Sequence, residues 1–339
     1  MKVRRPDRLR RGGVTALQII AVAALYYAFG RLGLLQQLVR GQVTPLWPPT
    51  GIALASLLLV GPRVWPGIAL GAVLVNLPLG PSVPLVLVIA AGNTAAPLCS
   101  YALLRLTGFR AEMNRFRDAL TLVFLGGFTG MLISSTLGSS TLYLAQVLPT
   151  GEFWPTWWVW WTGDAMGVVL VAPVLLVLRS AQRPRLIPPS RWAEGALLAA
   201  TTAAFGLLLL ETAPAPLLFF GFPLLIWAAF RFQHAGAVPC ALAVSTFAII
   251  AATRETGPFA GHSLLANMVS LQTFNGTAAL TALLLSATIT ERNQTQAEIE
   301  EACVRLAEMV TRTTPDIGGS PLPGAQGDEE EGGGRAPSP

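Results

Sequence analysis

Residues 153–167 read F-W-P-T-W-W-V-W-W-T-G-D-A-M-G and place five of the chain's nine tryptophans just ahead of Asp164. Tryptophan gathers at membrane interfaces because its ring is apolar while its N–H needs a polar partner. The stretch therefore predicts a helix that enters lipid near Trp157, with Asp164 about 10 Å further along. An ionised aspartate at that depth costs about 2.5–3.5 kcal/mol. We therefore expect Asp164 to be protonated, paired or facing a polar cavity, and it is the leading candidate for a functional site.

The composition around this stretch indicates a membrane protein. Hydrophobic residues make up 53% of the chain, charged residues make up 12%, and the mean hydropathy is +0.56; soluble domains carry about 25% charged residues. The sequence pI is about 9.6, but the basic residues lie in short clusters between apolar runs. That pattern orients membrane helices, so we expect no nucleic-acid partner. Cys99, Cys240 and Cys303 form no C-x-x-C pair, which predicts neither disulfides nor zinc.

The apolar runs predict an all-α polytopic membrane protein. Eight runs are read as full transmembrane helices, at residues 14–35, 83–104, 118–146, 157–178, 192–210, 216–230, 235–253 and 264–290. Two further runs, 50–60 and 66–79, are short, because eleven residues rise about 17 Å against a hydrocarbon core of about 30 Å. They are expected to form either a re-entrant pair or two short crossings shielded by neighbours. The fold therefore has eight to ten membrane helices.

Charge placement predicts the orientation. Basic residues cluster at positions 2–11, 105–117, 179–191 and 231, which all fall on one side of the membrane in this alternation. By the positive-inside rule that side is the cytoplasm, so both termini are expected there.

The chain is expected to divide into four parts. Residues 1–13 form a basic cytoplasmic N-terminus, 14–290 the membrane-embedded domain, 291–310 a cytoplasmic helical extension, and 311–339 a Gly-, Pro- and Glu-rich tail expected to be disordered. The extension carries an apolar stripe at Ile299, Cys303, Leu306 and Val310. The stripe predicts either a homodimer through residues 285–310 or a frayed amphipathic helix.

Two features of the sequence before Asp164 are further candidates for a functional role. The segment T-P-L-W-P-P-T-G-I-A-L-A at 44–55 breaks the backbone where a helix starts, and Thr50 is expected to cap that helix. Arg63 lies between the two short runs. It is the counter-charge of Asp164 if the runs are re-entrant, and a cytoplasmic anchor if they are two crossings.

A few polar residues interrupt the apolar runs, including Asn76, Asn93 and Gln272. Such residues hold membrane helices together through hydrogen bonds of about 0.6 kcal/mol each, or they are the partners that Asp164 needs. Asp164 itself is either a ligand- or proton-responsive site or a structural pin between Gly163 and Gly167.

Several blocks together resemble a known family. They are W-P-P-T-G-I-A-L-A from Trp47, R-V-W-P-G from Arg63, L-G-A-V-L-V-N ending at Asn76, G-N-T around Asn93, and W-W-T-G-D-A-M-G-V-V-L-V-A-P from Trp160. Their order and spacing are similar to the first class of bacterial membrane-associated sensor domains, the MASE family, over about residues 14–292.

The resemblance implies an input module that is joined, in that family, to cytoplasmic histidine kinases, diguanylate cyclases or related outputs. The resemblance also marks eight residues of this chain as family motif positions, without assigning them a role. They are Trp47, Pro48, Pro49, Gly51, Asn93, Trp161, Gly163 and Asp164. The chain departs from the family pattern after Arg292, where about twenty helical residues and a tail are expected in place of an output domain.

Motifs for catalysis are absent from the sequence. It has no glycine-rich nucleotide loop, no G-x-S-x-G and no H-E-x-x-H. His234 is expected in a short cytoplasmic turn and His262 in an outer loop. We therefore expect a protein that is not an enzyme and that holds no metal and no cofactor.

The predicted function is a multi-pass sensory protein of the bacterial plasma membrane. It would bind a ligand or partner in the bilayer and signal to a separate cytoplasmic protein such as a histidine kinase. A secondary transporter and a membrane scaffold for a kinase are the alternatives. The candidate sensing residues are Asp164, Trp161, Trp160, Gly163, Asn93, Asn76, Trp47, Pro48, Pro49, Gly51, Arg63 and Gln272.

Overall fold

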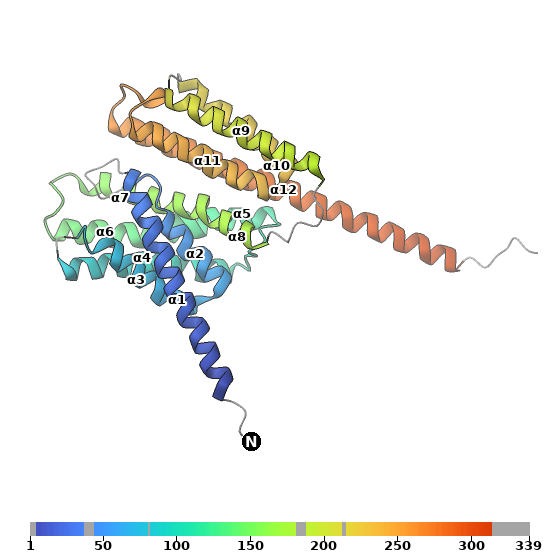
Figure 1. The fold of residues 1–339 in the computed structure, drawn as a ribbon, viewed down its shortest axis with the longest axis horizontal. Coiled ribbons are helices and arrows are strands. Elements are labelled where there is room, and N and C mark those ends of the chain that lie inside the picture. The colour runs from blue at the N-terminus through green and yellow to red at the C-terminus, as the bar shows by residue number, and fades with distance from the viewer. Residues whose placement is uncertain (1–4, 37–43, 81, 181–187, 212–214, 314–339) are drawn as a thin grey trace, which may run out of the picture. The chain divides into compact units, whose positions relative to one another are not determined.

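The computed structural model describes residues 5–36, 44–80, 82–180, 188–211 and 215–313 of the chain. Within these ranges every regular element is a helix (Figure 1). The chain divides into two compact units, Met1–Arg292 and Asn293–Pro339. Most of the predicted disordered tail, from residue 314 onward, lies outside the described residues.

The elements follow one another along the chain as α1 (Arg5–Gly33), η1 (Leu34–Gln36), α2 (Pro48–Val60), η2 (Pro62–Val64), α3 (Trp65–Asn76), α4 (Val83–Leu106), α5 (Phe116–Thr121), η3 (Leu122–Thr129), α6 (Leu132–Leu144), α7 (Phe153–Met166), η4 (Gly167–Val171), α8 (Ala172–Ser180), α9 (Pro189–Glu211), η5 (Ala215–Phe220), α10 (Gly221–Phe232), α11 (His234–Thr253), η6 (Gly257–Phe259) and α12 (Leu264–Thr313). The elements η3 and η4 are π-helices, and the other η elements are 3₁₀-helices.

Seven stretches of described helix are long and apolar enough to cross a membrane, so the chain is an all-α multi-pass membrane protein. They are Gly12–Gly33, Val83–Leu106, Phe116–Leu144, Phe153–Arg179, Pro189–Glu211, His234–Thr253 and Leu265–Met309. All seven correspond to predicted runs. The full range of eight to ten crossings and the cytoplasmic location of both termini stay predictions.

The sequence predicted a full-length transmembrane helix at 216–230, whereas the α-helix in the structure is shorter. Pro216–Phe232 is a shorter apolar stretch, divided between the 3₁₀-helix η5 and the helix α10. Pro223 explains the division, because its ring nitrogen cannot donate the helical hydrogen bond to the carbonyl of Phe219. The α-helix therefore begins only at Gly221.

The two short runs form the helices α2 and α3. Helix α2 begins on Pro48 and Pro49, which suit a first turn because N–H groups there need no helical partner. Thr50 does not act as the predicted cap: the N-cap position belongs to Trp47, and the Thr50 hydroxyl donates instead to the Trp47 carbonyl at 2.7 Å. Most of α2 is buried, and it packs against α1, α4 and η4.

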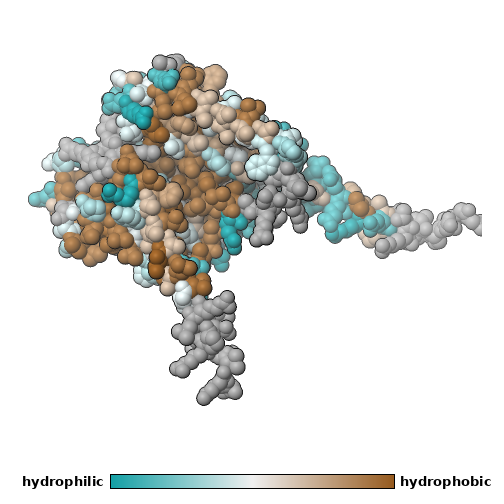
Figure 2. Space-filling model, in the orientation of Figure 1, coloured by the Kyte–Doolittle hydropathy of each residue, from teal (hydrophilic) through white to brown (hydrophobic). Residues whose placement is uncertain are grey.

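The outer surface of the first unit is apolar. Figure 2 shows hydrophobic residues spread over the face in view. Large side chains such as Leu17, Leu106 and Leu144 are 67%, 85% and 80% exposed. Exposed apolar surface on this scale marks a membrane-facing protein, since lipid tails cover it.

Helix α12 contributes to the core of the first unit with small residues. One narrow internal gap is bordered by Val169 and Leu170 of η4, Val238 and Ala241 of α11, and Ala279, Ala282 and Leu283 of α12. Figure 1 shows α9, α10, α11 and the first part of α12 running side by side. Small side chains let these helix backbones approach closely, which favours packing inside a bilayer.

The described part of the second unit is the end of α12. Its side chains from 293 to 309 are all exposed, and this segment is largely hydrophilic in Figure 2. The predicted apolar stripe lies on it at Ile299, Cys303 and Leu306, while the side chain of Val310 lies outside the described residues.

Candidate functional site

Four of the tryptophans at the start of α7 divide into two roles. Trp154 and Trp158 are exposed, at 63% and 53%, as expected for an interfacial belt. Trp157 and Trp161 stack with ring centroids 5.9 Å apart. Their indole N–H groups donate to the Thr136 hydroxyl at 3.1 Å and to the Phe128 carbonyl at 2.8 Å, which ties α7 to α6 and η3.

Glycines let α7 and η4 touch the backbone of the segment that leads into α2. A Cβ atom on Gly163 would lie 2.3 Å from the Thr44 carbonyl oxygen, and one on Gly167 would lie 2.0 Å from the Trp47 carbonyl oxygen. The Trp47 amide donates to the Gly163 carbonyl at 2.9 Å. The W-P-P-T-G and T-G-D-A-M-G blocks, far apart in sequence, therefore form one contact that only glycine permits.

Asp164 lies inside this contact and is fully buried. Its Oδ2 atom accepts a hydrogen bond of 2.5 Å from the Ser134 hydroxyl of α6. Its backbone carbonyl accepts from the Thr50 hydroxyl at 3.1 Å. Its Oδ1 atom is buried and meets no donor with full hydrogen-bond geometry among the described residues, although the Trp160 indole lies close enough to interact with the carboxyl group. A carboxylate with a buried free oxygen is a strong candidate for binding a ligand, because leaving it unsatisfied costs free energy.

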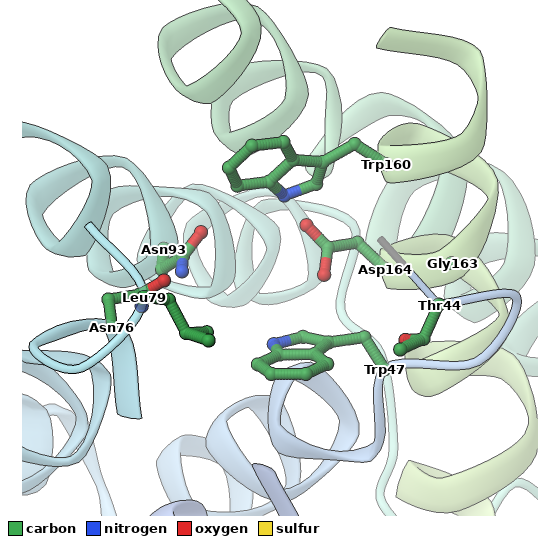
Figure 3. A pocket seen from close by; sticks show the side chains of 8 residues that line it. All are labelled: Thr44, Trp47, Asn76, Leu79, Asn93, Trp160, Gly163 and Asp164. Carbon is green, nitrogen blue, oxygen red and sulfur yellow. The ribbon is translucent and has the colours of Figure 1, made fainter. Parts of the chain in front are cut away.

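A small cavity opens at this carboxylate. It has about 40 Å³ of room for the centres of water molecules, and it is lined by Thr44, Trp47, Asn76, Leu79, Asn93, Trp160, Gly163 and Asp164. Since about 10–15 Å³ is enough to hold one water, the cavity holds a few waters or one small ligand. Figure 3 shows the indoles of Trp47 and Trp160 on opposite sides of Asp164, with Asn93 and Asn76 across the cavity.

Two oxygen atoms of the cavity wall lack a hydrogen-bond donor among the described residues. The Asn93 Oδ1 atom on α4 is buried and unpaired among the described residues, like Asp164 Oδ1. Asn76 uses its amide nitrogen on its own helix, donating to the Ala72 carbonyl at 2.8 Å. Tyr26 of α1 lies close by: its hydroxyl is buried beside Trp47, within electrostatic range of Asp164.

Residues 44–47, which form part of the cavity wall, are also hydrogen-bonded to α12. The Gln272 side-chain amide of α12 donates to the Pro45 carbonyl at 2.9 Å, and Thr44 and Trp47 on either side of Pro45 line the cavity. Gln272 is therefore not a lining residue. It joins the wall of the cavity to the last transmembrane helix.

The remaining predicted site residues lie around the cavity rather than on it. Pro48 and Pro49 form the first turn of α2. Gly51 packs against η4, where a Cβ atom would lie 2.2 Å from the Gly167 carbonyl oxygen. Arg63 is exposed in η2 and does not line the cavity, which fits the anchor interpretation better than the counter-charge interpretation.

The sequence interpretation missed a second buried polar cluster, centred on His234. This residue begins α11 and is buried, not in an open turn. Its Nε2 atom is 2.9 Å from the Met113 carbonyl, and its Nδ1 atom is 2.7 Å from the Ser286 hydroxyl of α12. A carbonyl only accepts, so Nε2 carries the hydrogen and, in the neutral ring, Nδ1 accepts from Ser286.

Ser134, Thr44 and Leu79 were also missed. Ser134 is one of several serines and threonines on α6, and no local signal separates it from the others. Thr44 lies in the segment before α2 and Leu79 in the turn after α3, where the sequence shows only that the chain turns. The proximity of Thr44 to the P-P-T-G block was the one available clue.

Fold and site together define a class: a helical multi-pass membrane protein with a buried carboxylate in a small polar cavity, connected to its last helix. The profile of the MASE1 family matches residues 17–293, and the chain belongs to this family of membrane-associated sensor domains. No curated protein and no solved structure is significantly similar to the chain.

Proposed function

We propose that the chain is a sensory input protein of the bacterial plasma membrane. It binds a ligand in the Asp164 cavity and passes a conformational change through α12 to a separate cytoplasmic signalling protein, such as a histidine kinase. The catalytic step of the signal then belongs to that partner and not to this chain. Membership of the MASE1 family and the multi-pass fold support the sensory assignment.

The observation that carries this proposal is the double role of residues 44–47. Thr44 and Trp47 line the cavity, and Pro45 between them accepts the hydrogen bond from Gln272 of α12. A ligand that displaces the Trp47 indole moves the backbone to which α12 is bonded. Such a ligand shifts the protein between two arrangements only if it binds one of them more tightly.

The exposed end of α12 supports an output through contact with another protein. Ile299 and Leu306 are 58% and 57% exposed on the largely hydrophilic end of α12, where Val304 and Met309 are exposed as well. Cys303, on the same stripe, is exposed as well. The stripe suits pairing with a second copy of this chain or with a helix of the signalling partner.

The test uses Cys303 as a reporter of the output helix. With Cys99 and Cys240 replaced by alanine, full-length protein in native membranes is treated with a short bismaleimide after growth in different media. Wild-type cross-linking is expected to vary with the medium, and Asp164→Asn is expected to abolish the variation because the cavity loses its charge. Arg63→Gln, which alters an exposed charge away from the cavity, is the control and should respond like wild type.

An Asp164→Asn protein whose cross-linking varies as in wild type would contradict the proposal. The alternatives have their own tests. Substrate flux into proteoliposomes that depends on Asp164 would favour a transporter. Co-purification of a kinase that persists in Asp164→Asn but is lost when residues 291–339 are removed would favour a scaffold.

A further inference from the structure

The Asp164 cavity has the chemistry of a site for a positive charge. Among the described residues that line it, Asp164 is the one ionisable residue and none is basic. The Ser134 hydroxyl donates to the carboxylate, and the indole nitrogen of Trp160 points toward it in Figure 3. No basic side chain among the described residues pairs with the carboxyl group. Burial disfavours an ionised carboxylate without a partner, so the ionised form is favoured when a cation binds beside it.

The unpaired atoms indicate what kind of cation fits. Asp164 Oδ1 and Asn93 Oδ1 both lack a donor, and both residues face the same space. An ammonium group has N–H donors and no acceptor, so it satisfies such a pair without leaving a group of its own unpaired. One carboxylate supplies one negative charge, which suits a monovalent cation.

The aromatic walls favour an ammonium group over an alkali-metal ion. Trp47 and Trp160 flank the carboxylate on opposite sides (Figure 3). Potassium and sodium ions need a shell of oxygen ligands, whereas two indoles occupy much of this wall.

An adjoining cavity extends the site with an apolar section. It has about 30 Å³ of room for water centres and is lined by Asn76, Leu79, Gly80, Ile89, Leu142 and Trp160. Three of these residues, Asn76, Leu79 and Trp160, also line the Asp164 cavity. The second cavity suits a short hydrocarbon chain attached to the charged group.

We propose that the cavity binds a small primary ammonium group, either the ammonium ion or the head of a short alkylamine, between Asp164 and Asn93. The inference rests on the proposed sensory function for its biological meaning, but the binding itself is measured independently. The ammonium ion fills the first cavity, and an alkyl tail of about three carbons extends past Leu79 into the second.

The test is a binding titration of the full chain in lipid nanodiscs. Intrinsic tryptophan fluorescence is followed at constant ionic strength with ammonium, methylammonium and n-propylammonium chloride, and with sodium, potassium and tetramethylammonium chloride as controls. A saturable change is expected for the first three only, because tetramethylammonium has no N–H donor. If n-propylammonium binds at least as tightly as ammonium, the ligand of the cavity is an alkylamine. If only ammonium binds, the ligand is the free ammonium ion.

Three variants locate the site. Asp164→Asn is expected to weaken binding more than a hundredfold, and Asn93→Ala about tenfold, because one hydrogen bond to a charged group is lost. Leu79→Trp fills the junction of the two cavities without removing a polar partner, and should weaken n-propylammonium more than ammonium. If Asp164→Asn fails to fold, the Leu79→Trp variant still tests whether the ligand binds in this cavity. Arg63→Gln should bind like wild type.

The outcomes separate the two proposals. No saturable response, an equal response to potassium, or binding that survives Asp164→Asn would overturn the ammonium site. Ammonium binding that leaves Cys303 cross-linking unchanged would keep the site and overturn the sensory function. Cross-linking that depends on Asp164 without any ammonium binding would keep the function and overturn the ligand class.

Discussion

Replacing Gly167 with alanine is expected to destabilise the protein by about 2–3 kcal/mol, at the upper end of the usual cost of overpacking. The added Cβ atom would lie 2.0 Å from the Trp47 carbonyl oxygen and 2.4 Å from the Thr50 hydroxyl oxygen. The backbone oxygen cannot rotate away as a flexible side chain could. The segment entering α2 must therefore move off η4, and Trp47 leaves the wall of the Asp164 cavity.

The measurement is the free energy of unfolding in mixed detergent micelles, read from a titration with a denaturing detergent. Gly276→Ala on α12 is the matched control, because nothing lies within 4 Å of the Cβ atom it would add. That change should be neutral or stabilise the protein by up to about 1 kcal/mol, since alanine is the better helix former. Equal stability of the two variants would contradict the close packing of Gly167 on Trp47.

The second large effect is expected at His234. Replacing it with leucine should destabilise the protein by about 2–3 kcal/mol, because the buried Met113 carbonyl loses its donor. Ser286 also loses its partner on α11, although its hydroxyl can still donate to the Ala282 carbonyl. The change releases the start of α11 from the loop before α5 and from α12.

His262→Leu is the matched control, because His262 is the only other histidine of the chain and is exposed. Exposed substitutions usually change stability by less than about 0.5 kcal/mol. The same unfolding titration checks both variants. A His234→Leu protein as stable as His262→Leu would show that the buried hydrogen bonds of His234 do not hold α12.

The class of protein and the main candidate residue could be predicted from local sequence properties. The tryptophan belt places a membrane entry point, and helical rise places Asp164 beyond it. Hydropathy is a property of each segment by itself, so the seven long apolar stretches were also predictable. The division of the stretch at 216–230 into a 3₁₀-helix and an α-helix was not predictable, because hydropathy does not register how Pro223 divides a helix.

The partners of Asp164 could not be predicted. The sequence suggested Arg63 or the polar asparagines as partners of Asp164. In the structure its side chain accepts a hydrogen bond from Ser134, thirty positions earlier in the chain. Any of several hydroxyl groups on α6 had the right chemistry. Which of them meets the carboxylate depends on how α6 and α7 rotate against each other, and that rotation is set by packing along their whole length.

By itself, the sequence determined that this chain is a helical membrane protein with a costly carboxylate in an apolar stretch, because hydrophobicity and charge act on each segment separately. The tertiary structure decided that residues 44–47 lie on Gly163 and Gly167, that the carboxylate faces a small acceptor-rich cavity, and that Gln272 and His234 bond α12 to the rest of the fold. Those features arise from contacts between distant segments, whose geometry is settled only when all helices pack together.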